Sequence, residues 1–167
     1  LVFKPAMLAT SILLIYYWRA YNKLIQTINN DFSKNKYFLY FGVGSAIFLL
    51  IHSILLGINF EIDLYKLFRR FVMLGFIIFE LAAQALLIRH LIKIKYQIIE
   101  IINQKVLIFK IIVVSLLIVV GVLSIPILAS SEYVHFKHAL EWNYFLGVIV
   151  FYLFTYLFWK KQKIQSL

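Results

Sequence analysis

The chain contains no cysteine and few charged residues, and both shortages limit what it can be. Without cysteine there is no disulfide, no thiolate nucleophile, no iron–sulfur cluster and no Cys-bound zinc. Only 14% of the 167 residues are charged, whereas roughly a quarter are charged in an average soluble domain. Because a surface that faces water needs charges, the composition argues against a soluble protein.

Apolar residues, in contrast, make up 63% of the sequence, and its mean hydropathy is +0.91. Charged residues divide the chain into five apolar runs that approach the roughly 20 residues needed to cross a bilayer. None of the runs alternates between polar and apolar residues, so the strands of a membrane barrel are excluded. The sequence therefore predicts an all-α integral membrane bundle, a single transmembrane domain over 1–167 with helices near 3–21, 37–58, 71–92, 108–128 and 142–159.

Lysine and arginine are divided unevenly between the two ends of these helices. Twelve lie on the side of the loops 19–36 and 89–110 and of the C-terminal tail, and five lie on the other side. Because basic loops remain in the cytoplasm, we expect the first side to be cytoplasmic, or to face the matrix in an organelle. Its basic rim is a candidate site for anionic lipid headgroups and comprises Arg19, Lys23, Arg89, Lys93, Lys95, Lys160 and Lys161. The orientation explains the net charge of +10, and we expect no nucleic acid partner.

Glu80 is the ionisable residue that lies deepest in an expected span, and a charge there is costly. Gln84 follows at i+4 and shares its helix face. The pattern fits a proton or cation relay, or a lipid headgroup site, but also a protonated Glu that holds two helices together. His52 lies inside the second expected helix. It is interpreted as a hydrogen-bonded interior residue rather than a haem ligand, because no other span offers a second His at that depth.

A polar cluster precedes the last expected helix on the outer side, with His135, His138, Glu141 and Trp142 at helical spacing. Two histidines and a carboxylate are a plausible zinc set, although hydrolytic zinc motifs place their histidines at i and i+4. A polar collar that seats the last helix at the interface is the alternative interpretation, and we assign no metal site and no catalytic residue.

The stretch 138–142 (HALEW) and the later FYLFT at 151–155 resemble the end of the DRAM/Sfk-type membrane family. YWRAY at 17–21 and the Gly42-x-x-Ser45 pattern are similar to that family's second and third helices, but its His-x-x-Gly-Ala signature is replaced by LYKLF at 64–68. The resemblance implies helices two to six of a six-helix protein, with a first helix missing. It also implies a non-enzymatic role in organising lipids or scaffolding partners, and related proteins act in lipid remodelling of membrane anchors.

Three functions therefore remain open at this point. The first is a non-enzymatic multi-pass protein that interacts with lipid or scaffolds membrane partners. The second is a small structural or proton-handling subunit of a large energy-transducing complex, and the third is an integral-membrane lipid hydrolase or remodelling enzyme. We expect membrane lipids and other membrane protein subunits as partners, and bound phospholipid in place of any cofactor.

Overall fold

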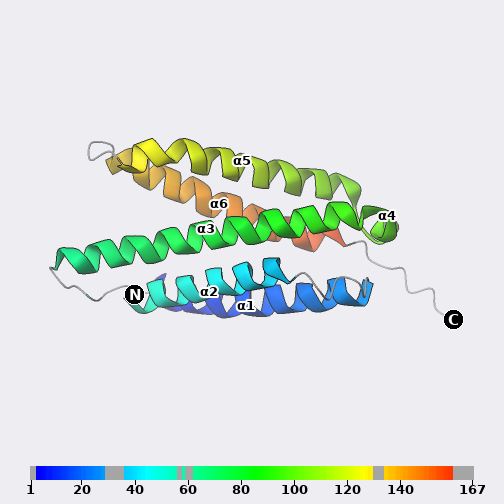
Figure 1. Cartoon of the computed structure of the whole chain (residues 1–167), viewed down its shortest axis with the longest axis horizontal. Coiled ribbons are helices and arrows are strands. Elements are labelled where there is room, and N and C mark those ends of the chain that lie inside the picture. The colour runs from blue at the N-terminus through cyan, green and yellow to red at the C-terminus, as the bar shows by residue number, and fades with distance from the viewer. Residues whose placement is uncertain (1–2, 29–35, 56–57, 59–61, 130–133, 160–167) are drawn as a thin grey trace. The chain divides into compact units, whose positions relative to one another are not determined.

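The computed structural model of the chain describes residues 3–28, 36–55, 58, 62–129 and 134–159, and leaves out the side chains of residues 3, 66 and 123–142. These residues form six helices: α1 (Phe3–Ile28), α2 (Tyr37–Leu55), α3 (Asp63–Lys93), α4 (Lys95–Ile98), α5 (Gln104–Ala129) and α6 (Val134–Phe158) (Figure 1). Apart from an isolated bridge between Ile102 and Trp159, the described residues contain no β structure. The predicted all-α class is confirmed.

Three helices are long and apolar enough to cross a membrane: α2, α3 and the part of α5 from Gln104 to Val122. The described part of α6, Asn143–Phe158, is apolar but shorter. Three of the five expected spans are therefore found among the described residues, and they fit an integral membrane protein. Helix α1 is long, with 26 residues, but its second half carries Arg19 and Lys23 and is more polar.

Most helices extend beyond the apolar runs that predicted them. Helix α1 continues to Ile28, α3 begins at Asp63, and α6 begins at Val134, whereas α2 already ends at Leu55. Charged residues bounded the expected helices, but a helix continues through them wherever their charges reach water or headgroups. Exposed Lys23 therefore lies in α1, where a loop was expected.

The chain forms two compact units, Leu1–Arg89 and His90–Leu167. The prediction of a single transmembrane domain stays a prediction.

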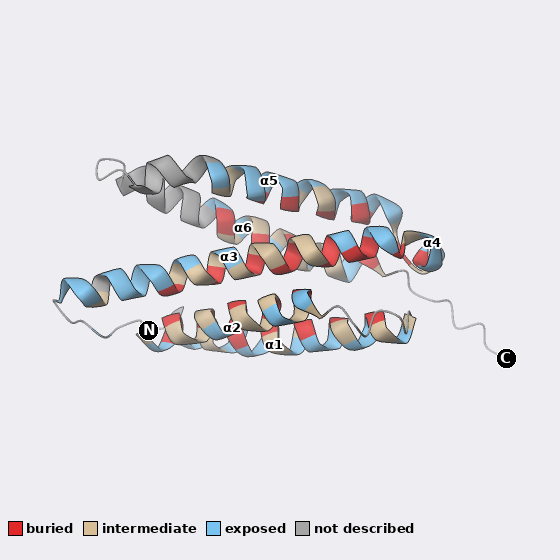
Figure 2. Cartoon of the chain, viewed as in Figure 1, coloured by how far each residue is buried: buried red, intermediate tan, exposed pale blue. Residues whose placement is uncertain are grey.

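In the first unit, α1 and α2 pack along stripes of buried residues spaced alternately three and four apart. The α1 stripe is Met7, Ser11, Leu14, Trp18, Tyr21 and Ile25, and the α2 stripe includes Phe38, Gly42, Ser45, Leu49 and His52. This spacing keeps one face of each helix toward its neighbour. In Figure 2 the buried positions of α3 begin only after its first turns, which are exposed.

In the second unit, α5 and α6 run side by side (Figure 1). Val114 and Leu117 of α5 and Val148 and Phe151 of α6 are buried. A Cβ on Gly147 would lie 2.5 Å from Leu117 Cδ2, so the two helices approach closely at that glycine. The Asn103 amide donates to the Phe158 carbonyl over 2.8 Å and joins the start of α5 to the end of α6.

Candidate functional site

A buried polar cluster in the first unit joins α2 and α3. It consists of Ser45 from α2 and of Glu80 and Gln84 from α3, and the side chains of all three have 0% exposure. Glu80 and Gln84 are one helical turn apart, which places both on the face of α3 that carries its buried stripe. The cluster therefore lies against protein on a helix that is apolar enough to span a membrane.

Short hydrogen bonds hold the cluster together. Ser45 Oγ lies 2.6 Å from Glu80 Oε2 and 2.8 Å from the carbonyl oxygen of Gly42. Gln84 Nε2 donates to Glu80 Oε1 over 2.9 Å. In the described part of the chain, Gln84 Oε1 accepts no hydrogen bond although it is buried. Both carboxyl oxygens of Glu80 are thus engaged.

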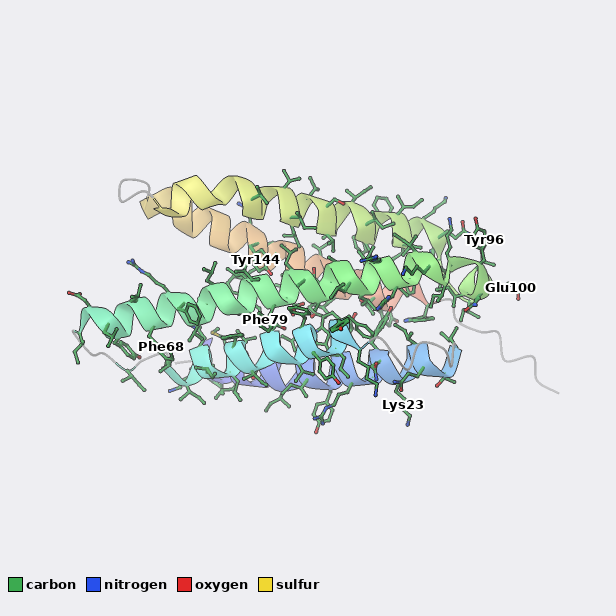
Figure 3. All side chains as sticks on the ribbon, in the orientation of Figure 1. Lys23, Phe68, Phe79, Tyr96, Glu100 and Tyr144 are labelled. Atoms are coloured by element: carbon green, nitrogen blue, oxygen red, sulfur yellow. The ribbon has the colours of Figure 1, made fainter. Side chains whose placement is uncertain are left out.

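Glycines and aromatic rings position the two helices around this cluster. A Cβ on Gly44 would lie 2.6 Å from Phe79 Cδ1, and a Cβ on Gly75 would lie 2.9 Å from Phe48 Cε1. The Phe79 and Phe48 rings are in edge contact, with centroids 5.1 Å apart. In Figure 3 Phe79 lies between α3 and α2. Because each glycine accepts a ring from the other helix, α2 and α3 approach closely enough for Ser45 to reach Glu80.

Helix α1 contributes a further close contact. A Cβ on Gly42 would overlap the Trp18 ring, which is completely buried and also packs at 6.3 Å from the Phe38 ring. Gly42 is also the residue whose carbonyl oxygen faces Ser45 Oγ. The Trp18 contact therefore fixes the part of α2 that carries the polar cluster.

Lys110 is a buried cation that lies within the helix expected near 108–128, although its charge was counted with those of the loop 89–110. The structure places it inside α5 with 0% exposure. Its Nζ donates to Thr155 Oγ1 over 2.7 Å and lies 4.2 Å from the centroid of the Phe151 ring and 5.4 Å from that of Phe158. The ammonium group is stabilised by the two ring faces and by its position near the C-terminal end of α6.

The described members of the basic rim are largely accessible. Arg19, Lys23, Arg89 and Lys93 are exposed, and Lys95 is half-buried. Lys23 extends outward from α1 in Figure 3. Lys160 and Lys161 lie outside the described residues.

Register places four basic residues of the first unit, Arg19, Lys23, Lys36 and Arg89, at the same end of it, whereas Lys4, Arg69 and Arg70 lie at the other end. Phe48 packs on Gly75 and Phe79 packs on Gly44, so α2 and α3 run antiparallel. Arg89, near the end of α3, therefore lies at the level of Lys36, just before α2. The Trp18–Gly42 contact and a hydrogen bond from Ser53 Oγ to the Lys4 carbonyl (3.2 Å) show that α1 and α2 are also antiparallel. Arg19 and Lys23 therefore lie at that same end.

His52 and the four residues of the outer cluster are the remaining candidates from the sequence. His52 is buried with 8% exposure on the face of α2 that also carries Ser45. The backbone of His135, His138, Glu141 and Trp142 lies in α6, but their side chains are outside the described part of the structure. Within the described residues no group of three His, Cys, Asp or Glu side chains is arranged to hold a metal ion.

Sequence reasoning found Glu80 and Gln84 but missed that Ser45 is their partner. Ser45 could have been recognised from its position in the sequence, three residues after Gly42. If the second and third helices are antiparallel, Ser45 lies at the same depth in the membrane as Glu80. Comparison with known proteins gives no further guide, because no family model, no curated protein and no solved structure matches the chain.

Proposed function

We propose that this is a non-enzymatic, multi-pass membrane protein that holds anionic lipid headgroups at its basic rim. The observation that carries the proposal is that three exposed basic residues, Arg19, Lys23 and Arg89, lie at the same end of the first unit as half-buried Lys36. In the second unit, exposed Lys93 and Lys105 similarly lie near the start of α5.

Exposed tyrosines accompany these basic residues. Tyr37 and Tyr40 have 61% and 65% exposure at the start of α2, and Tyr96 in α4 has 85%. Tyrosine rings prefer the headgroup level of a bilayer, where their apolar body and polar hydroxyl are both satisfied. Lysine and arginine at that level attract anionic lipids by roughly 1 kcal/mol each. The combination supports a lipid-binding rim, which the positive-inside rule assigns to the cytoplasmic or matrix side.

Lipid selectivity tests this proposal. The full chain is reconstituted in vesicles that contain either brominated anionic or brominated zwitterionic phospholipid, and quenching of tryptophan emission is measured. Trp159, half-buried and bridged to Ile102 near the start of α5, reports from the part of the second unit that carries Lys105. We expect preferential quenching by the anionic lipid, and Lys105→Gln should reduce the preference by up to about fivefold, the equivalent of roughly 1 kcal/mol.

The matched control is Arg70→Gln, which removes an exposed charge near the opposite end of α3. It should leave the signal at Trp159 unchanged, and salt should weaken the wild-type preference by screening. Equal quenching by the two lipids in the wild-type protein would contradict the proposal.

The Ser45–Glu80–Gln84 cluster favours a second candidate, a small structural or proton-handling subunit of a larger energy-transducing membrane complex. Purification in a mild detergent separates the two functions. Stoichiometric co-purification of other subunits supports the complex, whereas a single polypeptide with bound anionic lipid supports the first proposal. The lipid hydrolase alternative rests on His135, His138 and Glu141 and stays a prediction.

A further inference from the structure

The hydrogen atoms available around Ser45 are too few for the contacts that it makes. Its hydroxyl oxygen lies within hydrogen-bond distance of two acceptors, the Gly42 carbonyl oxygen at 2.8 Å and Glu80 Oε2 at 2.6 Å. A hydroxyl group donates one hydrogen, and a carbonyl oxygen donates none. One hydroxyl hydrogen directed at either oxygen leaves the other contact without a hydrogen of its own. Of the two partners, only Glu80 can carry a second hydrogen.

We propose that the first unit holds one proton on Glu80, as a neutral carboxylic acid whose O–H donates to Ser45 Oγ. Ser45 then donates its own hydrogen to the Gly42 carbonyl, so that a continuous chain of hydrogen bonds runs from α3 to the backbone of α2. Glu80 Oε1 is the carbonyl oxygen of the acid and accepts from Gln84 Nε2 over 2.9 Å. In this arrangement the contacts of the carboxyl group with Ser45 and with Gln84 each have a donor and an acceptor.

Gln84 supplies an independent observation for the same site. Its Oε1 is buried and accepts no hydrogen bond from the described residues. It adds a fourth oxygen to those of Gly42, Ser45 and Glu80, and a proton is a ligand that such a group of oxygens can hold. The cluster also lies on two helices that are each apolar enough to span a membrane, where a neutral carboxyl is tolerated far better than a carboxylate.

Release of the proton preserves the link between the helices. When the proton leaves Glu80 Oε2 for a base, the Ser45 hydroxyl rotates and its hydrogen turns from the Gly42 carbonyl to the carboxylate. The Ser45 side chain thus donates in both states, to backbone in one and to Glu80 in the other. The site can load and unload a proton without separating α2 from α3, which an apolar contact between the helices could not provide. The inference does not depend on lipid binding at the rim.

Infrared spectroscopy of the full chain in vesicles tests the proposal directly. A neutral carboxyl has a C=O stretching band that a carboxylate lacks. We expect this band at neutral pH in the wild-type protein, its loss in Glu80→Gln and its retention in Glu100→Gln, which changes an exposed acid. Glu80→Gln should fold, because its amide donates to Ser45 and accepts from Gln84 as the neutral acid does. A spectrum without the band, or a band that Glu80→Gln leaves intact, would overturn the proposal.

A second variant and a change of salt make the test more specific. Ser45→Ala should keep the band but change its frequency, since the acid loses the acceptor of its O–H. Replacement of choline by sodium in the buffer should leave the band unchanged. If sodium abolishes it, the cluster takes up a metal cation in place of a proton, and the proposal fails.

Discussion

Lys110 is a basic residue whose charge is satisfied within the protein. Its ammonium group donates to Thr155 Oγ1 and lies over the rings of Phe151 and Phe158. Removing one partner of a buried charge usually costs more than replacing the charge itself by an apolar group of similar size. The stability of the α5–α6 pair should therefore respond differently to changes at residues 110 and 155.

Thr155→Val should lower the free energy of unfolding by about 1–3 kcal/mol, because the ammonium loses a buried acceptor. Lys110→Met, whose unbranched apolar side chain is one atom shorter, should change this free energy by less. The lost cation–π contacts are offset because no charge has to be desolvated. Titration with a denaturing detergent in mixed micelles measures both.

The control is a double-mutant cycle. In the Lys110→Met background, Thr155→Val should have almost no effect, because there is no ammonium to leave unpaired. Equal losses in both backgrounds would show that Thr155 acts through packing alone.

At the scale of helices, the packing of α2 against α3 depends on two reciprocal contacts, in each of which a phenylalanine of one helix lies against a glycine of the other. The Phe79 ring fills the space beside Gly44, and the Phe48 ring fills the space beside Gly75. A side chain added at either glycine must displace a ring that belongs to the other helix. The two contacts are four residues apart on each helix, so they set the register that brings Ser45 to Glu80.

Gly44→Leu should therefore destabilise the protein by about 1–3 kcal/mol through overpacking. Phe79→Ala in the same chain should restore part of the loss, because the new side chain then occupies the vacated space. Unfolding in mixed micelles is again the measurement, and Leu13→Ala, an exposed position on α1, serves as the control. A lack of any rescue would mean that the ring does not determine how closely the helices approach.

The sequence predicted the middle of each long helix better than its ends. Apolar runs define the buried length of a helix, but the boundaries depend on where side chains such as Lys23 find water or headgroups. The i+4 spacing of Glu80 and Gln84 was enough to place them on one face. Ser45 was not recognised as their partner, since the register between two helices depends on packing at Gly44 and Gly75 and is not visible in either helix alone.

At the scale of the whole chain, the charge asymmetry gives a topology that remains a prediction. Asp63, at the start of α3, and Glu100, between α4 and α5, are exposed residues on opposite sides of the expected membrane. Because the chain has no cysteine, a single introduced cysteine reports its own accessibility without background.

Asp63→Cys and Glu100→Cys should be labelled by an impermeant thiol reagent from opposite sides of sealed vesicles. Lys23→Cys should behave as Glu100→Cys does, because both positions lie on the side that carries the basic rim. The fraction labelled before and after the vesicles are opened is measured. Labelling of residues 63 and 100 from the same side would contradict the topology.

The length of α3 has a consequence for the membrane around it. Its 31 residues extend about 46 Å at a rise of 1.5 Å per residue, well beyond a hydrocarbon layer of roughly 30 Å. Between Arg70 and Arg89 the helix carries only one ionisable residue, Glu80, and this interval of 18 residues covers about 27 Å. Such a helix matches a thin bilayer in an upright position. In a thicker bilayer, the guanidinium groups at both ends must stretch along the helix to reach water, or the lipids beside α3 must compress.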